Sequence, residues 1–359
     1  MTVREWVANK IRNDLRTVVE KPAEWREDVA YTIDGMRRGT IDPLDVAKTV
    51  LATLATIVFV FVLLIPVYWI FIIALQGEGA TLYSTDSAGL IPSQFDPAAF
   101  VWVIGDIAIP GAIIGITIPF TDVEFYISWP RIVFLDASNY VDSTSDFPRY
   151  FRNSMFISFW TVVFAMLMIV PAAYAFSRRE FAGRMKLLYG YILFTQVGAG
   201  LGIASVIALY TIFSSMGVTN NRLVLSFYYA AMAVPFNTWL LKTYMDSIPT
   251  SLEEAAIMDG ASPFRVAWEV VLPLAKPGIA TIFIFIFLVG WMEFIIAQLI
   301  LSPEHYTLPV GLFSLIDEHN VPWGQFSAFA LVYASPVVFI YLFAQRYIED
   351  GFSFGGTKG

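Results

Sequence analysis

The chain has 359 residues, 57% of them hydrophobic, and a formal net charge of −8. Its mean hydropathy of +0.65 favours a membrane protein over a water-soluble one. The absence of cysteine excludes disulfides and thiolate chemistry, two histidines are too few for a histidine-rich metal site, and no P-loop sequence occurs. We therefore predict no enzyme activity, no metal or cofactor bound by this chain, and no nucleic-acid partner.

Residues 1–48 form a polar and charged N-terminal arm. Apolar residues recur in it at helical spacing from Trp6 to Val18, and lysines and arginines accompany them. The arm lacks the apolar core and cleavage site of a signal peptide. Two interpretations stay open: an amphipathic helix on the inner membrane surface, or a loosely ordered arm.

Six apolar stretches are long enough to cross a membrane, since each has the roughly 20 residues that a hydrocarbon core of about 30 Å requires. They must be helices, because lipid offers no partners to the polar groups of the backbone. The predicted fold is therefore all-α, a polytopic membrane domain over residues 49–348 followed by a tail at 349–359. The predicted spans are 49–76, 153–177, 187–214, 223–244, 277–301 and 326–348.

A seventh apolar stretch, residues 98–120, contains Asp106, Pro110 and Pro119. The distribution of basic residues decides whether it spans. Six spans with the N-terminus inside place 18 lysines and arginines inside and four outside, whereas seven spans give 13 and nine. We therefore predict six spans, both termini in the cytoplasm, and an interfacial or packed helix over 98–120. The predicted external loops are 77–150, 215–222 and 302–325, and the internal loops are 178–186 and 245–276.

Some residues inside the predicted spans are polar or small. Gln196 and Asn237 are interpreted as residues that line a pathway or bond to a neighbouring helix. Gly198 and Gly202 form a G-x-x-x-G pair, for which tight helix packing is the expected use. Three other spans contain a proline that is expected to interrupt the helix: Pro66, Pro171 and Pro336.

The most specific pattern lies at residues 251–273, between the fourth and fifth spans. Ser251 and Glu254 match an S-x-x-E capping box, which predicts a helix that starts at Leu252. Small alanines follow on one side of this helix. Asp259-Gly260 should end it, with the glycine in a left-handed turn.

A second short helix should follow the turn. Ser262 is placed to cap it and Pro263 suits its first position. Phe264, Trp268 and Val271 then recur at helical spacing, and Leu272-Pro273 should stop the element before the next span. The prediction is a helix-turn-helix at a membrane surface, with an apolar face to offer to a groove on a partner.

Glu293 lies inside the fifth span. A charged side chain near the middle of a membrane costs roughly 3 kcal/mol on insertion scales, so it should face protein or water. Two interpretations stay open. Glu293 either helps to shape a translocation pathway or forms a structural hydrogen bond to a neighbouring helix.

The 251–273 stretch resembles the loop signature of ABC-importer permeases, which is E-A-A, three residues, glycine, nine residues, an aliphatic residue, one residue and L-P. The flanking Asp259 and Ala261, and the terminal FSFGGTKG, are similar to the carbohydrate-uptake branch, in particular its maltose/maltodextrin (MalG-type) members. The similarity covers about residues 50–359. The signature residues are Glu254-Ala255-Ala256, Gly260, Val270 and Leu272-Pro273.

The resemblance implies the MetI-like permease fold and a role as permease subunit of an ATP-driven, binding-protein-dependent importer of maltose, maltodextrin or a similar oligosaccharide. The chain would form half of a pore in the cell membrane with a second, homologous permease. Two ATPase subunits that carry ATP and Mg²⁺ would bind from inside. An extracytoplasmic solute-binding protein would deliver the sugar, which the partner permease would mainly hold. The residues expected in the ATPase-coupling loop are Glu253, Glu254, Ala255, Ala256, Asp259, Gly260, Ala261, Phe264, Leu272 and Pro273.

The external loop 302–325 resembles the family's loop that reaches into the solute-binding protein. It is otherwise a simple connector, although 24 residues is long for two neighbouring helices. A secondary transporter or a membrane scaffold without an ATPase remains the alternative to the importer. The residues expected to contact the binding protein are Tyr306, Thr307, Leu308, Pro309, Val310, Gly311 and Leu312.

Overall fold

The computed structural model describes residues 31–353 with gaps at 33, 41, 77–94, 106, 110–111, 118–123, 130–131, 136, 140, 142, 201 and 318–320. The chain divides into two compact units, Met1–Trp69 and Ile70–Gly359. Most of the predicted N-terminal arm and the end of the predicted tail lie outside the described residues. Neither interpretation of the arm is therefore tested.

Most of the described residues of the first unit belong to the long helix α2, Pro43–Ala74. The last turn of this helix belongs to the second unit. Asp42 stands just before it and accepts a hydrogen bond of 2.9 Å from the backbone N–H of Leu44. Apolar side chains surround the helix and almost all are exposed, as expected of a helix that faces lipid. This helix confirms the first predicted span, and it runs through Pro66 without interruption.

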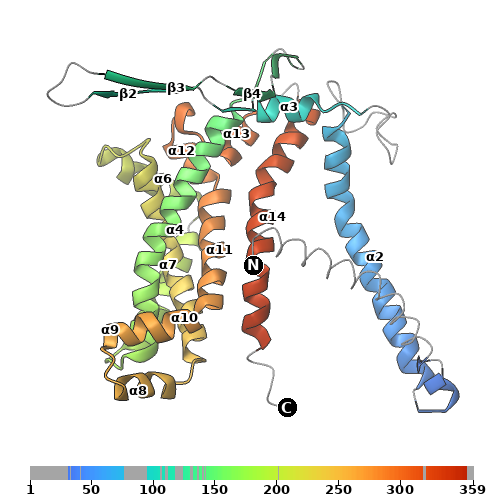
Figure 1. Cartoon of the computed structure of the whole chain (residues 1–359), viewed down its shortest axis with the longest axis vertical. Coiled ribbons are helices and arrows are strands. Elements are labelled where there is room, and N and C mark those ends of the chain that lie inside the picture. Colours follow the sequence, from blue (N-terminus) through green and yellow to red (C-terminus); the bar gives the residue numbers. More distant parts are fainter. Residues whose placement is uncertain are drawn as a thin grey trace. The chain divides into compact units, whose positions relative to one another are not determined.

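Four long helices form the core of the second unit: α4 (Phe147–Arg178), α7 (Arg222–Asp246), α11 (Lys276–Met292) and α14 (Trp323–Ser353). α4 packs along α7 and α11, and α11 also packs against α7 and α14 (Figure 1). Small residues allow the close approach, because a Cβ added at Gly290 of α11 would lie 2.8 Å from the Cα of Ser158 in α4. Trp291 is fully buried beside this contact.

Four of the predicted spans are unbroken helices long and apolar enough to cross a membrane: α2, α4, α7 and α14. The third predicted span consists of two helices, α5 (Arg184–Gly200) and α6 (Ile203–Ser215). The fifth consists of α11 and the short helix α12 (Ile295–Ile300). Within the described residues this arrangement is compatible with six spans. Pro171 and Pro336 lie inside α4 and α14 and, contrary to the prediction, do not interrupt them.

Each broken span has a local cause. Gly202 precedes α6 with φ +55°, a left-handed conformation that ends a helix, and it has open space around it. It therefore cannot form a tight packing pair with Gly198 on one continuous helix, and that prediction is wrong. Glu293 has an extended backbone, with φ −68° and ψ 130°, which ends α11 before α12 begins. The side chains of Gln196 and its neighbours up to Leu201 lie outside the described part of the chain.

The segment 98–120 is only partly helical, so the predicted interfacial helix is wrong beyond Ile104. Helix α3, Ala98–Ile104, is followed by β1 (Ile107–Ile109), β2 (Ala112–Thr117), β3 (Glu124–Trp129) and β4 (Ile132–Leu135). β2 pairs with β3 and β1 with β4, both antiparallel, in two-stranded ribbons. Isoleucine-rich segments bounded by prolines favour strands over a helix. The domain remains mostly helical, and among the described residues the named strands lie within the predicted external loop 77–150.

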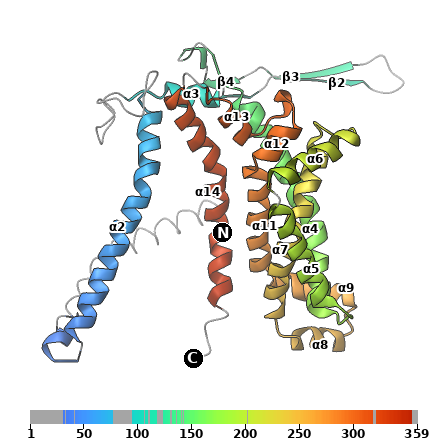
Figure 2. The same ribbon diagram turned by 180° about the vertical axis from the view of Figure 1, so that it is seen from behind.

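Short elements close the two ends of the second unit. At one end lie α8 (Ser251–Met258) and α9 (Pro263–Arg265), and at the other lie α12 and α13 (Leu308–Phe313), as Figure 2 shows. A π-helical segment, η3 (Val266–Val271), and a last turn, α10 (Leu272–Leu274), join α9 to α11. Two 3₁₀ turns, η2 (Ala137–Asn139) and η4 (Pro303–His305), complete the described elements.

Candidate functional site

Helix α8 begins one residue earlier than predicted, at Ser251. Thr250 occupies the N-cap position with a helical backbone, φ −65° and ψ −23°, and its carbonyl accepts from the N–H of Glu253 at 2.9 Å and of Glu254 at 3.0 Å. Ser251 therefore lies within the first turn, where its hydroxyl cannot cap the helix. The predicted capping box between Ser251 and Glu254 is wrong.

The turn after α8 agrees with the prediction. Gly260 has φ +86°, the left-handed conformation that glycine tolerates, and its N–H donates to the carbonyl of Ile257 at 2.9 Å. Ser262 caps the next helix, since its hydroxyl accepts from the N–H of Arg265 at 3.3 Å, and Pro263 takes the first helical position. The predicted helix-turn-helix is present.

The second helix differs from the predicted apolar stripe because its middle is π-helical. The wider turn of η3 changes the direction of successive side chains. Phe264 and Trp268 stack with ring centroids 6.3 Å apart, and both point outward, whereas Val271 is fully buried. Leu272-Pro273 does not stop the segment. The chain bends by 76° between α10 and α11, two residues beyond the predicted stop.

An apolar patch is exposed at this end of the unit, and we call it the docking patch. Its side chains belong to the α8–η3 segment, outside the long helices that can span a membrane. Large exposed apolar side chains close together on a surface are typical of an interaction site. The docking patch consists of Ile257 (55% exposed), Met258 (87%), Phe264 (77%) and Trp268 (64%).

The residues predicted in the coupling loop do not all face the same way. Glu254 and Ala255 are exposed, as are Asp259, Gly260 and Pro273. Ala256, Ala261 and Leu272 are half-buried and pack against the core of the unit. Glu253 is buried, and its carboxylate pairs with Arg178 inside the unit. The structure thus divides the loop into an outer surface and an inner anchor.

Arg178 forms that anchor and was missed by the sequence analysis. Its Nε donates to Oε1 of Glu253 at 2.5 Å, and its Nη2 donates to the carbonyl of Ile248 at 3.0 Å. The neighbouring Ser177 hydroxyl donates to Oδ1 of Asp246 at 2.7 Å, and Lys242 pairs with the same carboxylate. These bonds fix the end of α4 to the segment that leads into α8. No local sequence signal indicates a pair 75 residues apart.

Residues 306–312, with the sequence Y-T-L-P-V-G-L, lie at the other end of the unit and pack against its long helices. Thr307, Leu308 and Val310 are almost fully buried, and the N–H of Leu308 donates to the Ser154 hydroxyl of α4 at 2.8 Å. Tyr306, Pro309 and Leu312 are half-buried, and Gly311 is buried. Contact of these residues with a binding protein stays a prediction. The exposed large apolar side chains of this loop come just afterwards, at Phe313 and Ile316.

Gly311 shows how closely this loop packs. A Cβ at this position would overlap the ring of Tyr150 in α4. Asn153 adds polar bonds, since its Nδ2 donates to the carbonyls of Glu304 at 3.1 Å and Tyr306 at 3.0 Å. The first half of the loop, from Glu304 to Gly311, is therefore held against α4.

Glu293 is placed by hydrogen bonds rather than by an open pathway. The hydroxyl of Tyr229 in α7 donates to its Oε2, and the N–H groups of Ile296 and Ala297 donate to its carboxylate at 2.8 and 3.1 Å. The carboxylate thus caps α12 and joins it to α7, which supports the structural interpretation of this residue. Asn237 is buried in α7 and donates to the carbonyl of Ala233 at 2.8 Å within the same helix.

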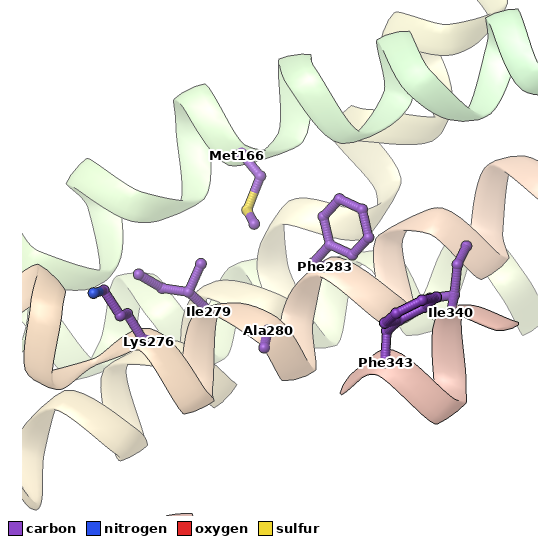
Figure 3. A pocket seen from close by; sticks show the side chains of 7 residues that line it. All are labelled: Met166, Lys276, Ile279, Ala280, Phe283, Ile340 and Phe343. Atoms are coloured by element: carbon purple, nitrogen blue, oxygen red, sulfur yellow. The ribbon is translucent and has the colours of Figure 1, made fainter. Parts of the chain in front are cut away.

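A groove of about 420 Å³ lies between α4, α11 and α14 (Figure 3). Lys276 supplies its single charged group, at the start of α11, and the other side chains are apolar. A sugar offers many hydroxyl groups, which this lining does not match with donors and acceptors. The lining residues are Met166, Lys276, Ile279, Ala280, Phe283, Ile340 and Phe343.

Both the sequence and the fold of this chain are similar to those of known proteins. Residues 149–353 match the family described as binding-protein-dependent transport system inner membrane component. This range holds α4 to α14, including the helix-turn-helix and the anchor. A crystal structure of a bacterial ABC transporter involved in the import of the acidic polysaccharide alginate matches 86% of this chain and 98% of that chain, with a TM-score of 0.63. Its sequence is 23% identical, so the likeness shows the fold.

Relatives in sequence are transport permeases. The inner membrane ABC transporter permease protein YcjP of Escherichia coli strain K12 is 35% identical over 59% of this chain and 75% of that protein. The galactooligosaccharides transport system permease protein GanQ of Bacillus subtilis strain 168 is 38% identical over 59% and 74%. The maltose/maltodextrin transport system permease protein MalG of Escherichia coli strain K12 is 34% identical over 58% and 71%.

Proposed function

The chain belongs to the family of binding-protein-dependent transport system inner membrane components, and from this premise we propose that it is the permease subunit of an ATP-driven oligosaccharide importer. It forms half of a pore in the plasma membrane together with a second, homologous permease. Two ATPase subunits bind at the α8 end, which faces the cytoplasm with both termini. A solute-binding protein delivers the sugar at the opposite end.

The observation that carries this proposal is the docking patch. Phe264 and Trp268 are 77% and 64% exposed on a short helix-turn-helix that is separated from α11 by a bend of 76°. Apolar side chains in water are unfavourable by about 25 cal/mol for each Å² of exposed apolar surface, so a partner that covers them gains this free energy. A secondary transporter or a scaffold without an ATPase leaves this surface without an occupant.

The names of two relatives support a neutral oligosaccharide as the substrate. GanQ is named for galactooligosaccharides and MalG for maltose and maltodextrin, and both are more than 30% identical to this chain. The groove between α4, α11 and α14 is too apolar to hold such a molecule by itself. We therefore assign the main sugar contacts to the partner permease and leave maltose, maltodextrin and galactooligosaccharides as the substrates to compare.

The test is reconstitution of the chain with its partner permease, ATPase and binding protein in proteoliposomes. We expect sugar uptake that requires ATP inside and loaded binding protein outside, with the ATPase recovered together with the permease. Uptake driven by an ion gradient without ATPase would support the secondary transporter. Neither uptake nor bound ATPase would support the scaffold.

A further inference from the structure

The buried ion pair between Arg178 and Glu253 differs from the other ion pairs between side chains of the described residues, because it joins two elements. Its side chains are 9% and 12% exposed and come from α4 and α8, 75 residues apart. The pairs Asp34–Arg38, Asp45–Lys48, Asp146–Arg149 and Arg265–Glu269 join residues three or four positions apart on exposed surfaces. Lys242–Asp246 is partly buried but lies within α7, and His305–Glu304 joins neighbours in the chain. Exposed local pairs contribute little. A buried pair between two elements instead fixes their relative orientation.

Arg178 also holds the backbone that leads into α8. Its Nη2 donates to the carbonyl of Ile248, and its Nη1 donates to the Ser177 hydroxyl at 3.2 Å. Ser177 in turn donates to Asp246 at the end of α7. The guanidinium group therefore sits where α4, the end of α7 and the start of α8 meet, and it bonds to two of these elements directly.

The other connections of α8 to the rest of the unit restrict its orientation less than the ion pair does. Pro249 and Thr250 precede the helix, and Gly260 follows it with open space around it. Side-chain burial on α8 is largely confined to Glu253, because Ala256 is half-buried and its other residues are exposed. Without the ion pair, a force on Ile257 or Met258, the members of the docking patch in α8, would tilt α8 about its two flanking turns. With the pair, the same force is passed to the end of α4, which packs along α7 and α11.

We propose that Arg178 and Glu253 form the joint that transmits movement of the ATPase-bound helix-turn-helix to α4 and thus to the transmembrane core. Both are positioning residues, because they act through α8 and need not contact the ATPase. This inference rests on the proposed importer function. It adds a specific claim: docking and transmission are separate, docking being on the outer surface of α8–η3 and transmission through its buried side.

The experiment uses the complete transporter in proteoliposomes and measures sugar imported for each ATP hydrolysed. Glu253→Gln removes the charge and keeps the size of the side chain, and Arg178→Lys keeps the charge but cannot make all the bonds of the guanidinium group. We expect both variants to bind the ATPase as the wild type does and to retain hydrolysis. Sugar imported per ATP should fall by about tenfold or more, within the range of typical coupling free energies.

If replacing Glu253 or Arg178 prevents assembly of the transporter, two further variants still test the proposal. Ser177→Ala removes the bond to Asp246 and the bond from Nη1 of Arg178 but leaves the ion pair intact, so it should lower the ratio by a smaller factor at an unchanged melting temperature. Asp146→Asn removes the exposed pair at the opposite end of α4 and serves as the matched control, with a wild-type ratio expected.

Three results would overturn the joint. One is a wild-type ratio in an assembled Glu253→Gln transporter. Another is loss of bound ATPase in that variant, which would make Glu253 part of the docking surface. The third, if only Ser177→Ala assembles, is a wild-type ratio in that variant. A wild-type chain that binds no ATPase at all would instead refute the proposed function, so the two failures are distinguishable.

Discussion

The two ends of the second unit make opposite use of similar short helices. At one end, the helix-turn-helix of α8 and α9 exposes Met258 and Phe264 by 87% and 77%. At the other end, α13 buries Leu308 completely and leaves Val310 only 2% exposed. Both stretches were predicted to contact partner proteins from their sequences alone. The first end exposes four large apolar side chains by 55–87%, whereas the second buries the predicted contact residues and exposes only Phe313 and Ile316 nearby, by 48% and 49%.

The difference follows from what each helix packs against. α13 lies against α4 through a backbone bond to Ser154 and a close approach of Gly311 to Tyr150. α8 is attached mainly through Glu253 and leaves its outer side free. A sequence signature can therefore mark a structural joint as well as a contact surface. Substitutions at the two ends should separate these roles.

The largest effect, on ATPase binding, is expected from removing the aromatic side chains of the docking patch. Phe264→Ser combined with Trp268→Ser removes two central aromatic side chains, each worth about 2 kcal/mol or more if they are interface hot spots. Together they should weaken ATPase binding roughly a thousandfold, since about 1.4 kcal/mol corresponds to tenfold. The measurement is binding of purified ATPase to the permease pair. The melting temperature of the permease should stay unchanged, and undiminished binding would remove the contrast between the two ends.

At the opposite end, Gly311→Ala should reduce folding stability rather than binding. The new methyl group overlaps the ring of Tyr150, and overpacking of this kind costs about 1–3 kcal/mol. Gly190→Ala is the matched control, because a Cβ at Gly190 meets nothing within 4 Å and its helix gains from alanine. Thermal melting in detergent compares the two. Equal melting temperatures would mean that the α13 loop is not tightly packed.

Glu293 tests the same end through its hydrogen bonds. Glu293→Leu leaves the Tyr229 hydroxyl and the first N–H groups of α12 without their acceptor, at about 1–3 kcal/mol for a buried unsatisfied group. Glu293→Gln should cost less, since it retains one acceptor oxygen. Melting temperatures of both variants check this order. A Leu variant more stable than the wild type and fully active in transport would exclude the structural and the pathway interpretation alike.

The smallest effect is expected at the start of α9. Ser262→Ala removes the cap on the N–H of Arg265, and such caps are worth about 1 kcal/mol. The second half of the helix-turn-helix should become less ordered, while the spans stay intact. Hydrogen exchange of residues 262–268 should accelerate, with a slight decrease in ATPase affinity. Exchange unchanged from the wild type would show that packing alone holds this helix.

Much of the fold followed from the sequence because long apolar segments have few structural options in a membrane. The helix breaks at Gly202 and Glu293 were not predicted, since neither residue disturbs the average hydropathy of its span. The ribbons at 107–135 were missed for a different reason: hydropathy cannot distinguish an apolar strand from an apolar helix.

The candidate site was predicted in part. The turn at Gly260 and the cap at Ser262 depend on neighbouring residues, so local rules could identify both. The capping box failed because Thr250 had already begun the helix. The spacing of Phe264 and Trp268 was recognised, but their separation from buried Val271 was not, because the π-helical segment lies between them and changes the helical period. The Arg178–Glu253 pair depends on tertiary structure and has no signal at fixed spacing in the sequence.

The central claim is that the docking patch is covered by the ATPase, and labelling of single cysteines tests it most directly. The chain has no cysteine of its own, so Met258→Cys and Phe264→Cys each introduce one thiol, and Ile316→Cys places a control at the opposite end. Purified permease pairs would be exposed to a maleimide with and without the ATPase. We predict that the ATPase slows labelling strongly at positions 258 and 264 and leaves position 316 unchanged. Equal labelling rates at Met258→Cys and Phe264→Cys in both samples, with the ATPase shown to be bound, would contradict the account.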